Sequence, residues 1–268
     1  MTHGVNTTNS FESIGTILGD LREKVIESRH IDVSSLPTKE ELDRQTAINA
    51  QKALSRQKQE FYSEQSLWPA DTPVSFNFSD WKPDLQENSK VAREAGKKAY
   101  LLAKRLAIGE KFNVVFVGAP GVGKTSLALA TLCELKKAGK GTVFVSTAEL
   151  AGLYQQKREY PDILKRLAKV EDAMKHSDVL LLDDLGTEGF STFNDFGVRT
   201  DMQQLIYRIS NARFDFKSNR VRGITLTTTN NSQDQLKKMY DPKIISRLVP
   251  ANKEQRVVFN GFKDVRGV

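Results

Sequence analysis

The residues with the clearest chemical meaning form one loop, Gly118 to Thr125, which matches G-x-x-x-x-G-K-[ST] at every fixed position. Glycine can adopt positive φ and let the backbone approach an oxyanion, and successive amides in such a loop point inward at phosphate. Lys124 can reach the β- and γ-phosphates of a nucleotide, and the Thr125 hydroxyl can bind Mg²⁺. The loop therefore predicts binding of ATP with Mg²⁺.

Two flanking elements must hold this loop in place. The apolar run Val114–Val117 predicts a buried strand before it, and Ser126–Leu132 predicts a helix after it. The positive end of the helix dipole would face the same anion. A glycine-rich turn with a chance lysine is the alternative, which the strand–loop–helix context disfavours. The predicted phosphate-binding residues are Gly118, Pro120, Gly121, Val122, Gly123, Lys124, Thr125 and Ser126.

A pair of carboxylates follows another apolar run. Val179–Leu182 predicts a strand that ends at Asp183-Asp184, and the carboxyl ends of strands form the ligand-binding edge of an open α/β sheet. Asp183 is the predicted Mg²⁺ ligand together with Thr125, acting through water because Mg²⁺ keeps much of its hydration shell. Asp184 is the predicted catalytic group that orients or activates the attacking water. The alternative for Asp184 is an acid that caps the turn at 185–187.

An amide follows the next predicted strand, Ile224–Thr228. Asn230 would lie beside the phosphate loop, where it could contact the γ-phosphate or the attacking water. The sequence Asn-Asn-Ser-Gln also favours a turn. The two interpretations are compatible.

The pattern of apolar runs predicts the fold. Strands 113–117, 142–145, 179–182, 224–228 and 256–259 alternate with helical segments 87–107, 124–138 and 148–175. Continuous apolar strands that alternate with helices predict a parallel five-stranded sheet covered by helices on both faces. We therefore expect an α/β nucleotide-binding domain.

The N-terminal part of the chain differs in composition. Apolar residues recur at helical spacing from Ser10 to Arg29, and a polar segment with a capping-box start follows Pro37. Trp68-Pro69 and Asp71-Thr72-Pro73 indicate a linker. We predict a small helical partner-binding region and linker over residues 1–70, and an ATPase domain over 71–268.

Bulk composition sets further limits. The 268 residues carry a net charge of +7, which favours polyanionic partners without specifying them. The single cysteine excludes a disulfide framework or a multi-cysteine zinc site within the chain. No apolar run approaches the ~18 residues that a membrane span needs, and the first residues lack signal-peptide features. A cytoplasmic location with no membrane partner is expected.

Taken in order, these segments resemble the AAA+ ATPases of the DnaC/DnaI helicase-loader and IstB transposition-helper group. The resemblance covers residues 75–266 and includes several stretches outside the phosphate loop. They are an aromatic entry segment (76–81), a Walker B strand (179–186), a helix ending in Asn-x-Arg-aromatic (205–214), a sensor-1 strand (227–230), an arginine-finger helix (244–248) and a closing Gly-x-x-x-x-Arg (261–266).

The resemblance implies roles for individual residues. Asn230 matches sensor 1, and Arg247 matches a catalytic arginine finger placed on the nucleotide of a neighbouring subunit, which implies self-association into an oligomer. A guanidinium near the γ-phosphate offsets the charge that develops in the transition state. Arg247 could instead form a surface ion pair with Asp241, a kind of pair that contributes little. No C-terminal helical lid is expected after the last predicted strand, which leaves Arg213 and Arg266 without assigned roles.

Basic segments suggest contacts with nucleic acid. Residues 154–160 combine tyrosines with basic side chains, followed by Lys165, Arg166 and Lys169; such residues can stack on bases and neutralise phosphates. A solvated helix face is the alternative, because acids are interspersed. Lys217, Arg220 and Arg222 form a second basic stretch, which either lines the same surface or is an ordinary polar loop.

The sequence thus predicts an ATP-dependent loader of a hexameric, DnaB-type replicative helicase onto single-stranded DNA in replication initiation. The N-terminal region would grip the helicase. The near alternative is an IstB-like transposition helper ATPase that binds duplex DNA and a transposase. A small-molecule kinase would need a lid and an acceptor pocket, for which no pattern is present. A nucleotide-binding adaptor with negligible turnover is a further alternative.

Overall fold

A computed structural model describes residues 19, 21, 23–25, 37–156, 160–187 and 198–267. The chain divides into two compact units, Met1–Gln51 and Lys52–Val268. Most of the helix predicted over Ser10–Arg29 lies outside the described residues. None of the helices in the described ranges combines the length and the apolar content that crossing a bilayer requires.

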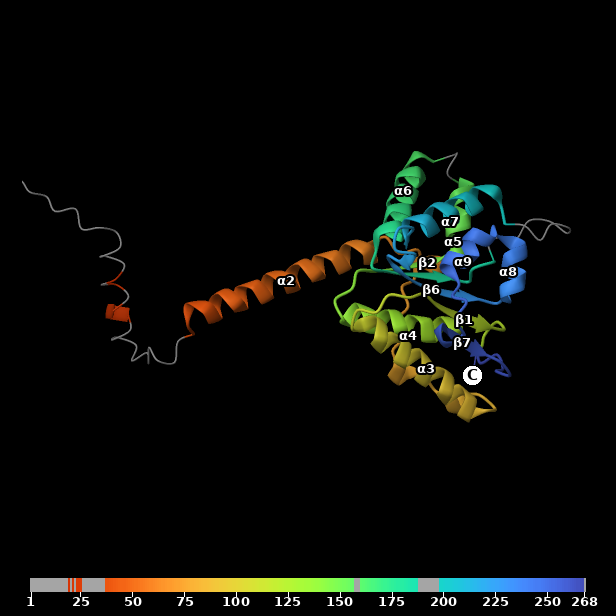
Figure 1. Cartoon of the computed structure of the whole chain (residues 1–268), viewed down its shortest axis with the longest axis horizontal. Helices are drawn as coiled ribbons and strands as arrows, with labels where there is room; N and C mark the ends of the chain where they lie inside the picture. Colours follow the sequence, from red (N-terminus) through yellow and green to blue (C-terminus); the bar gives the residue numbers. More distant parts are fainter. Residues whose placement is uncertain are drawn as a thin grey trace, which may run out of the picture. The chain divides into compact units, whose positions relative to one another are not determined.

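The second unit is built on a five-stranded sheet of order β2-β3-β6-β1-β7, in which every pair is parallel (Figure 1). This confirms the predicted sheet. Because β6 lies between β1 and β3, the carboxyl ends of these three strands meet at one edge. The strands are β1 (Val114–Gly118), β2 (Thr142–Ser146), β3 (Val179–Asp183), β6 (Ile224–Thr229) and β7 (Arg256–Phe259).

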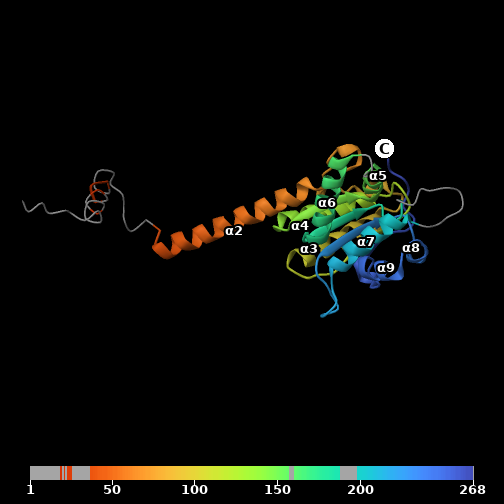
Figure 2. The ribbon, with the colours of Figure 1, turned by 90° about the horizontal axis from the view of Figure 1, so that it is seen from above.

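Helices cover both faces of the sheet, as predicted (Figures 1 and 2). Successive strand residues point to opposite faces. Phe116 and Leu181 therefore pack with α3 and α4, whereas Val115 and Leu182 pack with the other helices. One face carries α3 (Ser89–Ala107) and α4 (Lys124–Lys137); the other carries α5 (Thr147–Gln156), α6 (Pro161–His176), α7 (Thr200–Ala212), α8 (Gln233–Met239) and α9 (Pro242–Leu248).

Helix α2 (Lys39–Glu64) begins with the predicted capping box, in which Thr38 and Glu41 exchange hydrogen bonds. Its last turns belong to the second unit, where the Ser55 hydroxyl donates to the Gly139 carbonyl at 2.9 Å. Leu67 then forms a parallel bridge with Val145 of β2. The predicted boundary near residue 70 stays a prediction, while the compact unit takes in the chain from Lys52 onward.

Two short strands, β4 (Phe214–Asp215) and β5 (Arg220–Val221), form an antiparallel hairpin that the sequence analysis missed. Each has two residues, too few for a periodic pattern. Short 3-10 turns complete the described elements: Pro69–Asp71, Phe78–Asp80, Pro83–Leu85 and Lys253–Gln255.

Arg213, just before this hairpin, is buried and holds neighbouring elements together. Its guanidinium is 3% exposed and donates to the carbonyls of Met174, Ser177 and Ile224 and to the Thr225 hydroxyl. Burial lowers its pKa to about 9, so the side chain stays charged at neutral pH. It ties the ends of α6 and α7 to the start of β6.

Candidate nucleotide-binding site

The phosphate loop runs from the end of β1 into α4. Gly121 (φ +76°) and Gly123 (φ +93°) adopt the left-handed conformation that glycine takes without strain. Within the described chain, the backbone N–H groups of these two glycines donate to no protein acceptor. Unpaired donors at the start of a helix are what an oxyanion requires, so the loop fits a nucleotide phosphate.

Lys124 is held at the base of this loop. Its side chain is 4% exposed, and Nζ donates to the Ala119 carbonyl and to Asn230 Oδ1, both at 2.7 Å. Burial lowers the pKa of Lys124, while the negative charges of Asp184 and Asp183 act in the opposite direction. An ammonium has three donors, so one remains for a phosphate oxygen. Asn230 therefore lies beside the phosphate loop, where the sequence placed it.

Asp183 and Thr125 also meet. Asp183 Oδ1 accepts hydrogen bonds from the hydroxyls of Thr125 (2.9 Å) and Thr228 (2.6 Å). Burial raises the pKa of Asp183 to about 6, the charge of Asp184 adds to this, and the two hydroxyls oppose it. Hydroxyl and carboxylate oxygens suit Mg²⁺, which takes its other ligands from water and phosphate. The pair fits the predicted metal site.

Asp184 begins a turn and also borders the site. Strand β3 ends at Asp183, and Asp184 adopts φ +55°, which aspartate tolerates better than most residues. The Thr228 hydroxyl accepts its N–H, and the hydroxyls of Thr147 and Thr187 donate to its carbonyl, each at 2.8 Å. The turn at 185–187, which Asp184 would cap in the alternative interpretation, is thus present. The catalytic role stays a prediction.

Comparison with known proteins identifies the family. The family model described as IstB-like ATP binding protein matches residues 87–220, half of the chain. The chain belongs to this family. The resemblance to the DnaC/DnaI and IstB group of AAA+ ATPases is thereby confirmed. No curated protein gives a significant match to the sequence.

Solved structures resemble this IstB-like chain. A putative primosome component from Streptococcus pyogenes serotype M3 is 22% identical, with a TM-score of 0.51 over 75% of this chain and 95% of that one. The DnaC helicase loader is 25% identical, with a TM-score of 0.45 over 62% of this chain and 90% of that one. AMPPCP-bound DnaA from Aquifex aeolicus is 18% identical, with a TM-score of 0.45 over 63% of this chain. The match spans 46% of that DnaA chain. The similarity to the primosome component supports the fold assignment.

Arg247 lies far from the phosphate loop of its own IstB-like chain. Its carbonyl accepts a hydrogen bond from Asn113, which precedes β1, whereas the phosphate loop follows β1. The five residues of β1 place its amino end, beside Arg247, about 16 Å from its carboxyl end, where the phosphate loop begins. The guanidinium bonds to Asn211 Oδ1 and lies 4.9 Å from the centre of the Phe216 ring.

The alternative role proposed for Arg247, an ion pair with Asp241, is not formed among the described residues. Asp241 instead caps α9 by accepting the Lys243 N–H at 2.7 Å. The structure therefore brings Lys124, Thr125, Asp183, Asp184 and Asn230 together and leaves Arg247 at the other edge of the sheet.

Sequence reasoning assigned Trp81 to an entry segment and missed its contact with the phosphate loop. A Cβ at Gly123 would stand 2.7 Å from the Trp81 ring, and so would a Cβ at Gly96 in α3. The indole Nε1 donates to the Ala92 carbonyl at 3.0 Å. The tryptophan is wedged between α3 and the loop. A glycine in the middle of a predicted helix was the available signal.

The segment after β7 also borders the loop. The Asp264 carboxylate covers Gly121, so that a Cβ there would clash with it, and Val265 N–H donates to the Gly121 carbonyl at 3.2 Å. Hydrogen bonds from Arg266 lower the pKa of Asp264 to about 2. The positive charge of Arg266 also lowers the pKa of Lys124. Arg266, which had no assigned role, lies next to the site.

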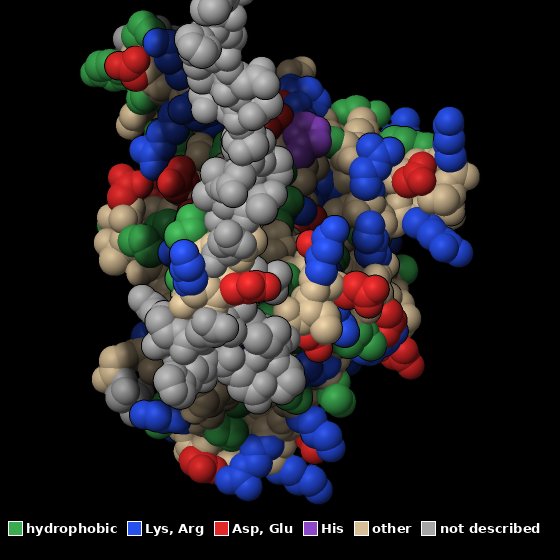
Figure 3. Space-filling model, turned by 90° about the vertical axis from the view of Figure 1, so that its left-hand side faces the viewer, with side chains coloured by type: hydrophobic (Ala, Val, Ile, Leu, Met, Phe, Trp, Pro, Cys, Tyr) green, Lys and Arg blue, Asp and Glu red, His purple; other side chains and the backbone are tan. Residues whose placement is uncertain are grey.

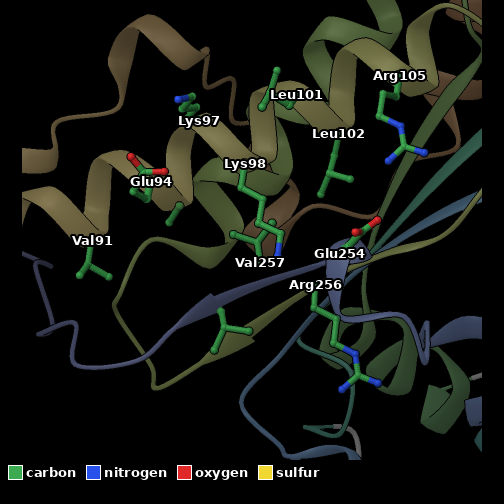
Figure 4. Close-up of a pocket in the computed structure, with 12 residues that line it drawn as sticks. Val91, Glu94, Lys97, Lys98, Leu101, Leu102, Arg105, Glu254, Arg256 and Val257 are labelled. Atoms are coloured by element: carbon green, nitrogen blue, oxygen red, sulfur yellow. The ribbon is translucent and has the colours of Figure 1, made fainter.

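A separate groove of about 560 Å³ runs between α3 and β7 (Figure 4). Its lining mixes apolar side chains such as Leu102 and Val257 with charged ones, and Lys98 Nζ donates to the Lys253 carbonyl at 3.0 Å. None of the predicted nucleotide-site residues lines it. The groove is distinct from the phosphate loop.

The segment predicted to contact nucleic acid is partly described, since residues 157–159 lie outside the described ranges. Tyr154 is 8% exposed and packs in the core, so it is not available to stack on a base; this part of the expectation was wrong. Tyr160 is 56% exposed. On the face drawn in Figure 3, basic and acidic side chains are interspersed. DNA contact by this segment stays a prediction.

Proposed function

We propose that this chain is an ATPase that loads a hexameric, DnaB-type replicative helicase onto single-stranded DNA. Membership of an ATP-binding family supports the nucleotide part of the proposal. The observation that carries it is the meeting of Lys124 with Asn230, and of Thr125 with Asp183, at the carboxyl edge of the sheet.

In this proposal each residue has a distinct task. The free amides of the loop and Lys124 bind the β- and γ-phosphates. Thr125 and Asp183 hold Mg²⁺, which would neutralise phosphate charge. Asp184 accepts a proton from the attacking water, and Asn230 orients that water. The three threonine hydroxyls that hold the Asp184 backbone keep its carboxylate in position.

Arg247 would act on the nucleotide of a second copy. The position of its backbone at the opposite edge of the sheet from its own phosphate loop supports this assignment. A triphosphate between two copies would then favour assembly, and its hydrolysis would let the copies separate. Loss of the γ-phosphate removes the charge that the guanidinium stabilises.

The N-terminal region, residues 1–70, would bind the helicase. No residue of α2 is buried; Leu42 (52% exposed) and Leu54 (67% exposed) face solvent, and only near its end does Tyr62 pack against the core. So polar a helix gains little stability from its own apolar face, which supports a role in contacting another molecule.

A transposition helper is the second candidate, because the matching family model describes IstB-like proteins. In that role the same ATPase would bind duplex DNA and contact a transposase. Both candidates share the nucleotide chemistry and the assembly. They differ in the partner and in the form of the DNA.

Size-exclusion chromatography with light scattering tests the proposal. The chain is mixed with a candidate DnaB-type helicase or with an IstB-associated transposase, with and without ATP, and Lys124→Ala serves as the control that cannot bind nucleotide. An ATP-dependent complex with the helicase alone is expected. A complex with the transposase alone, formed on duplex DNA, would replace helicase loading by the second candidate.

A further inference from the structure

One wall of the groove between α3 and β7 is a face of α3 that does not pack on the sheet (Figure 4). Its residues are spaced alternately by three and four, the repeat that places side chains on one side of a helix. They are Val91, Glu94, Lys98, Leu101 and Arg105. Val91 and Leu101 are 40% and 53% exposed, so this face leaves apolar surface open to a ligand.

The other wall is β7, which forms an edge of the five-stranded sheet. It pairs with β1 on one side, and no described strand pairs with its other side. In the described chain the backbone groups of residues 257–259 form no hydrogen bond outside that ladder. Val258 is 42% exposed. An unpaired edge of about 10 Å offers a row of backbone donors and acceptors to another chain.

The lining of the groove carries more positive than negative charge. Four cations and two acids line it: Lys97, Lys98, Arg105 and Arg256 against Glu94 and Glu254. Arg105 pairs with Glu110 at 2.6 Å, whereas Lys98 and Arg256 donate to backbone carbonyls. Among the described residues Lys97 forms no ion pair. The surplus of two positive charges favours an acidic ligand.

We infer that this groove binds an extended, acidic segment of a partner protein, which adds to the sheet as a strand beside β7. In this mode the main-chain hydrogen bonds to the edge provide affinity, and alternate side chains of the segment reach the neighbouring surface. Val91 and Leu101 contact its apolar side chains, and Lys97 attracts its carboxylates. The inference does not rest on the proposed function, because none of the residues assigned to the nucleotide lines the groove.

Other occupants match these walls less well. A helix satisfies its own backbone and would leave the β7 edge unpaired. A second copy that presented the same groove would bring two surpluses of positive charge together. A single-stranded nucleic acid gains much of its affinity from stacking on aromatic rings, and none of the lining residues is aromatic.

Peptide binding to the full chain tests the inference. The probe is a fluorescein-labelled peptide of eight residues in which glutamate and valine alternate, and fluorescence anisotropy measures its affinity. A lysine–valine peptide reverses the charge. A glutamate–proline peptide keeps the charge but cannot pair as a strand, because proline lacks an N–H and favours polyproline II. The glutamate–valine peptide should bind at least about 10-fold more tightly than either control.

Each control peptide can overturn one part of the inference. Equal binding of the glutamate–proline peptide would exclude strand addition. Equal binding of the lysine–valine peptide would exclude an acidic partner. No binding of the glutamate–valine peptide would overturn both parts.

A matched pair of variants locates the site. Leu101→Glu should weaken peptide binding by about 10-fold, because a lost apolar contact and a like charge both oppose the peptide. Ile108→Glu adds the same charge just after α3, at an 83% exposed side chain outside the lining, and should bind normally. Thermal unfolding checks that both variants fold. If Leu101→Glu binds no more weakly than Ile108→Glu, the groove is not the site.

Hydrogen exchange measured by mass spectrometry separates an added strand from a ligand that packs on α3. A strand would accept hydrogen bonds from outward-facing amides of β7, so exchange over residues 257–259 should slow by about 10-fold at saturating peptide. Protection confined to α3 would overturn strand addition.

Two further measurements cover the other occupants. Sedimentation of the free chain would reveal a dimer that both Leu101→Glu and the peptide dissolve, which would make a second copy the occupant. A labelled oligonucleotide that binds more weakly to Leu101→Glu than to Ile108→Glu would assign the groove to nucleic acid. We expect neither result, and either one would overturn the inference.

Discussion

The carboxyl and amino edges of the parallel sheet differ in how their polar side chains are partnered. At the carboxyl edge Lys124 and Asp183 are 4% and 5% exposed, and each has hydrogen-bond partners within the chain. At the amino edge Arg220 and Lys111 are exposed, and in the described chain they are unpaired. The polar groups of the first edge are held in place by bonds within the chain, whereas these two cations of the second edge are held by none, although Asp215 stands opposite Arg220 in the β4–β5 pair.

The largest expected effect comes from removing the buried cation of the carboxyl edge. Lys124→Ala should weaken ATP binding by more than about 100-fold, because a buried cation that contacts phosphate is lost from a low-dielectric site. Isothermal titration with ATP and Mg²⁺ measures this.

The fold should survive this substitution, since Lys124 is costly to bury and its removal leaves the sheet packing intact. The midpoint of thermal unfolding, followed by circular dichroism, is the control. A collapse of the unfolding transition would mean that Lys124 supports the fold rather than the ligand.

Asp184→Asn separates nucleotide binding from hydrolysis at the carboxyl edge, because it leaves the binding residues in place and removes the predicted proton acceptor. Hydrolysis should fall by about 10²- to 10⁴-fold, the usual contribution of general-base catalysis, with ATP affinity changed only a few-fold. Asparagine also tolerates positive φ, so the turn at this position should persist. Steady-state ATPase rates with single-stranded DNA give the answer, and equal rates would remove the catalytic role.

The buried carboxylate at the same edge predicts a pH dependence of stability in metal-free protein. The folded-state pKa of Asp183, about 6, lies above its ordinary value, 3.8. Its contribution to stability is therefore fully present below about pH 4 and is lost as the pH rises through 6. Asp183→Asn keeps an oxygen acceptor without the charge, so it should raise the free energy of unfolding by about 2 kcal/mol at pH 7.5 and by little at pH 4.

Urea unfolding in the presence of a chelator, at both pH values, measures this difference. Asp84→Asn, which removes an exposed carboxylate, serves as the reference. A gain for Asp183→Asn that is the same at pH 4 and pH 7.5 would contradict the assignment of the effect to a buried charge.

The smallest effect belongs to the amino edge. Phe216 is 60% exposed and supports the Arg247 guanidinium, a contact worth about 0.5–1 kcal/mol at an exposed site. Phe216→Ala should therefore lower assembly-dependent hydrolysis about 2- to 5-fold and leave stability almost unchanged, whereas Phe216→Tyr should retain activity. The turnover number at saturating ATP distinguishes the two. A change confined to KM would place Phe216 elsewhere in the cycle.

The carboxyl edge could be predicted almost residue by residue because its parts are local. A strand, a glycine loop and a helix are consecutive, and the acids and the amide each follow an apolar run that marks a strand end. Parallel pairing then brings Asp183 and Asn230 to Lys124 without any further information. The sheet order agrees with this placement, and the roles of the residues stay predictions.

The amino edge and the surroundings of the loop could not be predicted in the same way. The β4–β5 hairpin is too short to produce a periodic pattern, and Arg213 donates to carbonyls of α6, of the residue that caps it and of β6. Trp81 and Asp264 reach the phosphate loop from opposite ends of the domain sequence. Such contacts depend on tertiary packing, which single-sequence periodicity does not encode.

The wedged position of Trp81 has an optical consequence. The chain has two tryptophans, and only one of them touches the loop that would close around phosphate: Trp68 stacks instead on Phe144, with ring centroids 4.0 Å apart. Trp68→Phe would leave a single intrinsic fluorophore against Gly123. Its emission would follow occupancy of the loop in real time, in an otherwise unlabelled protein.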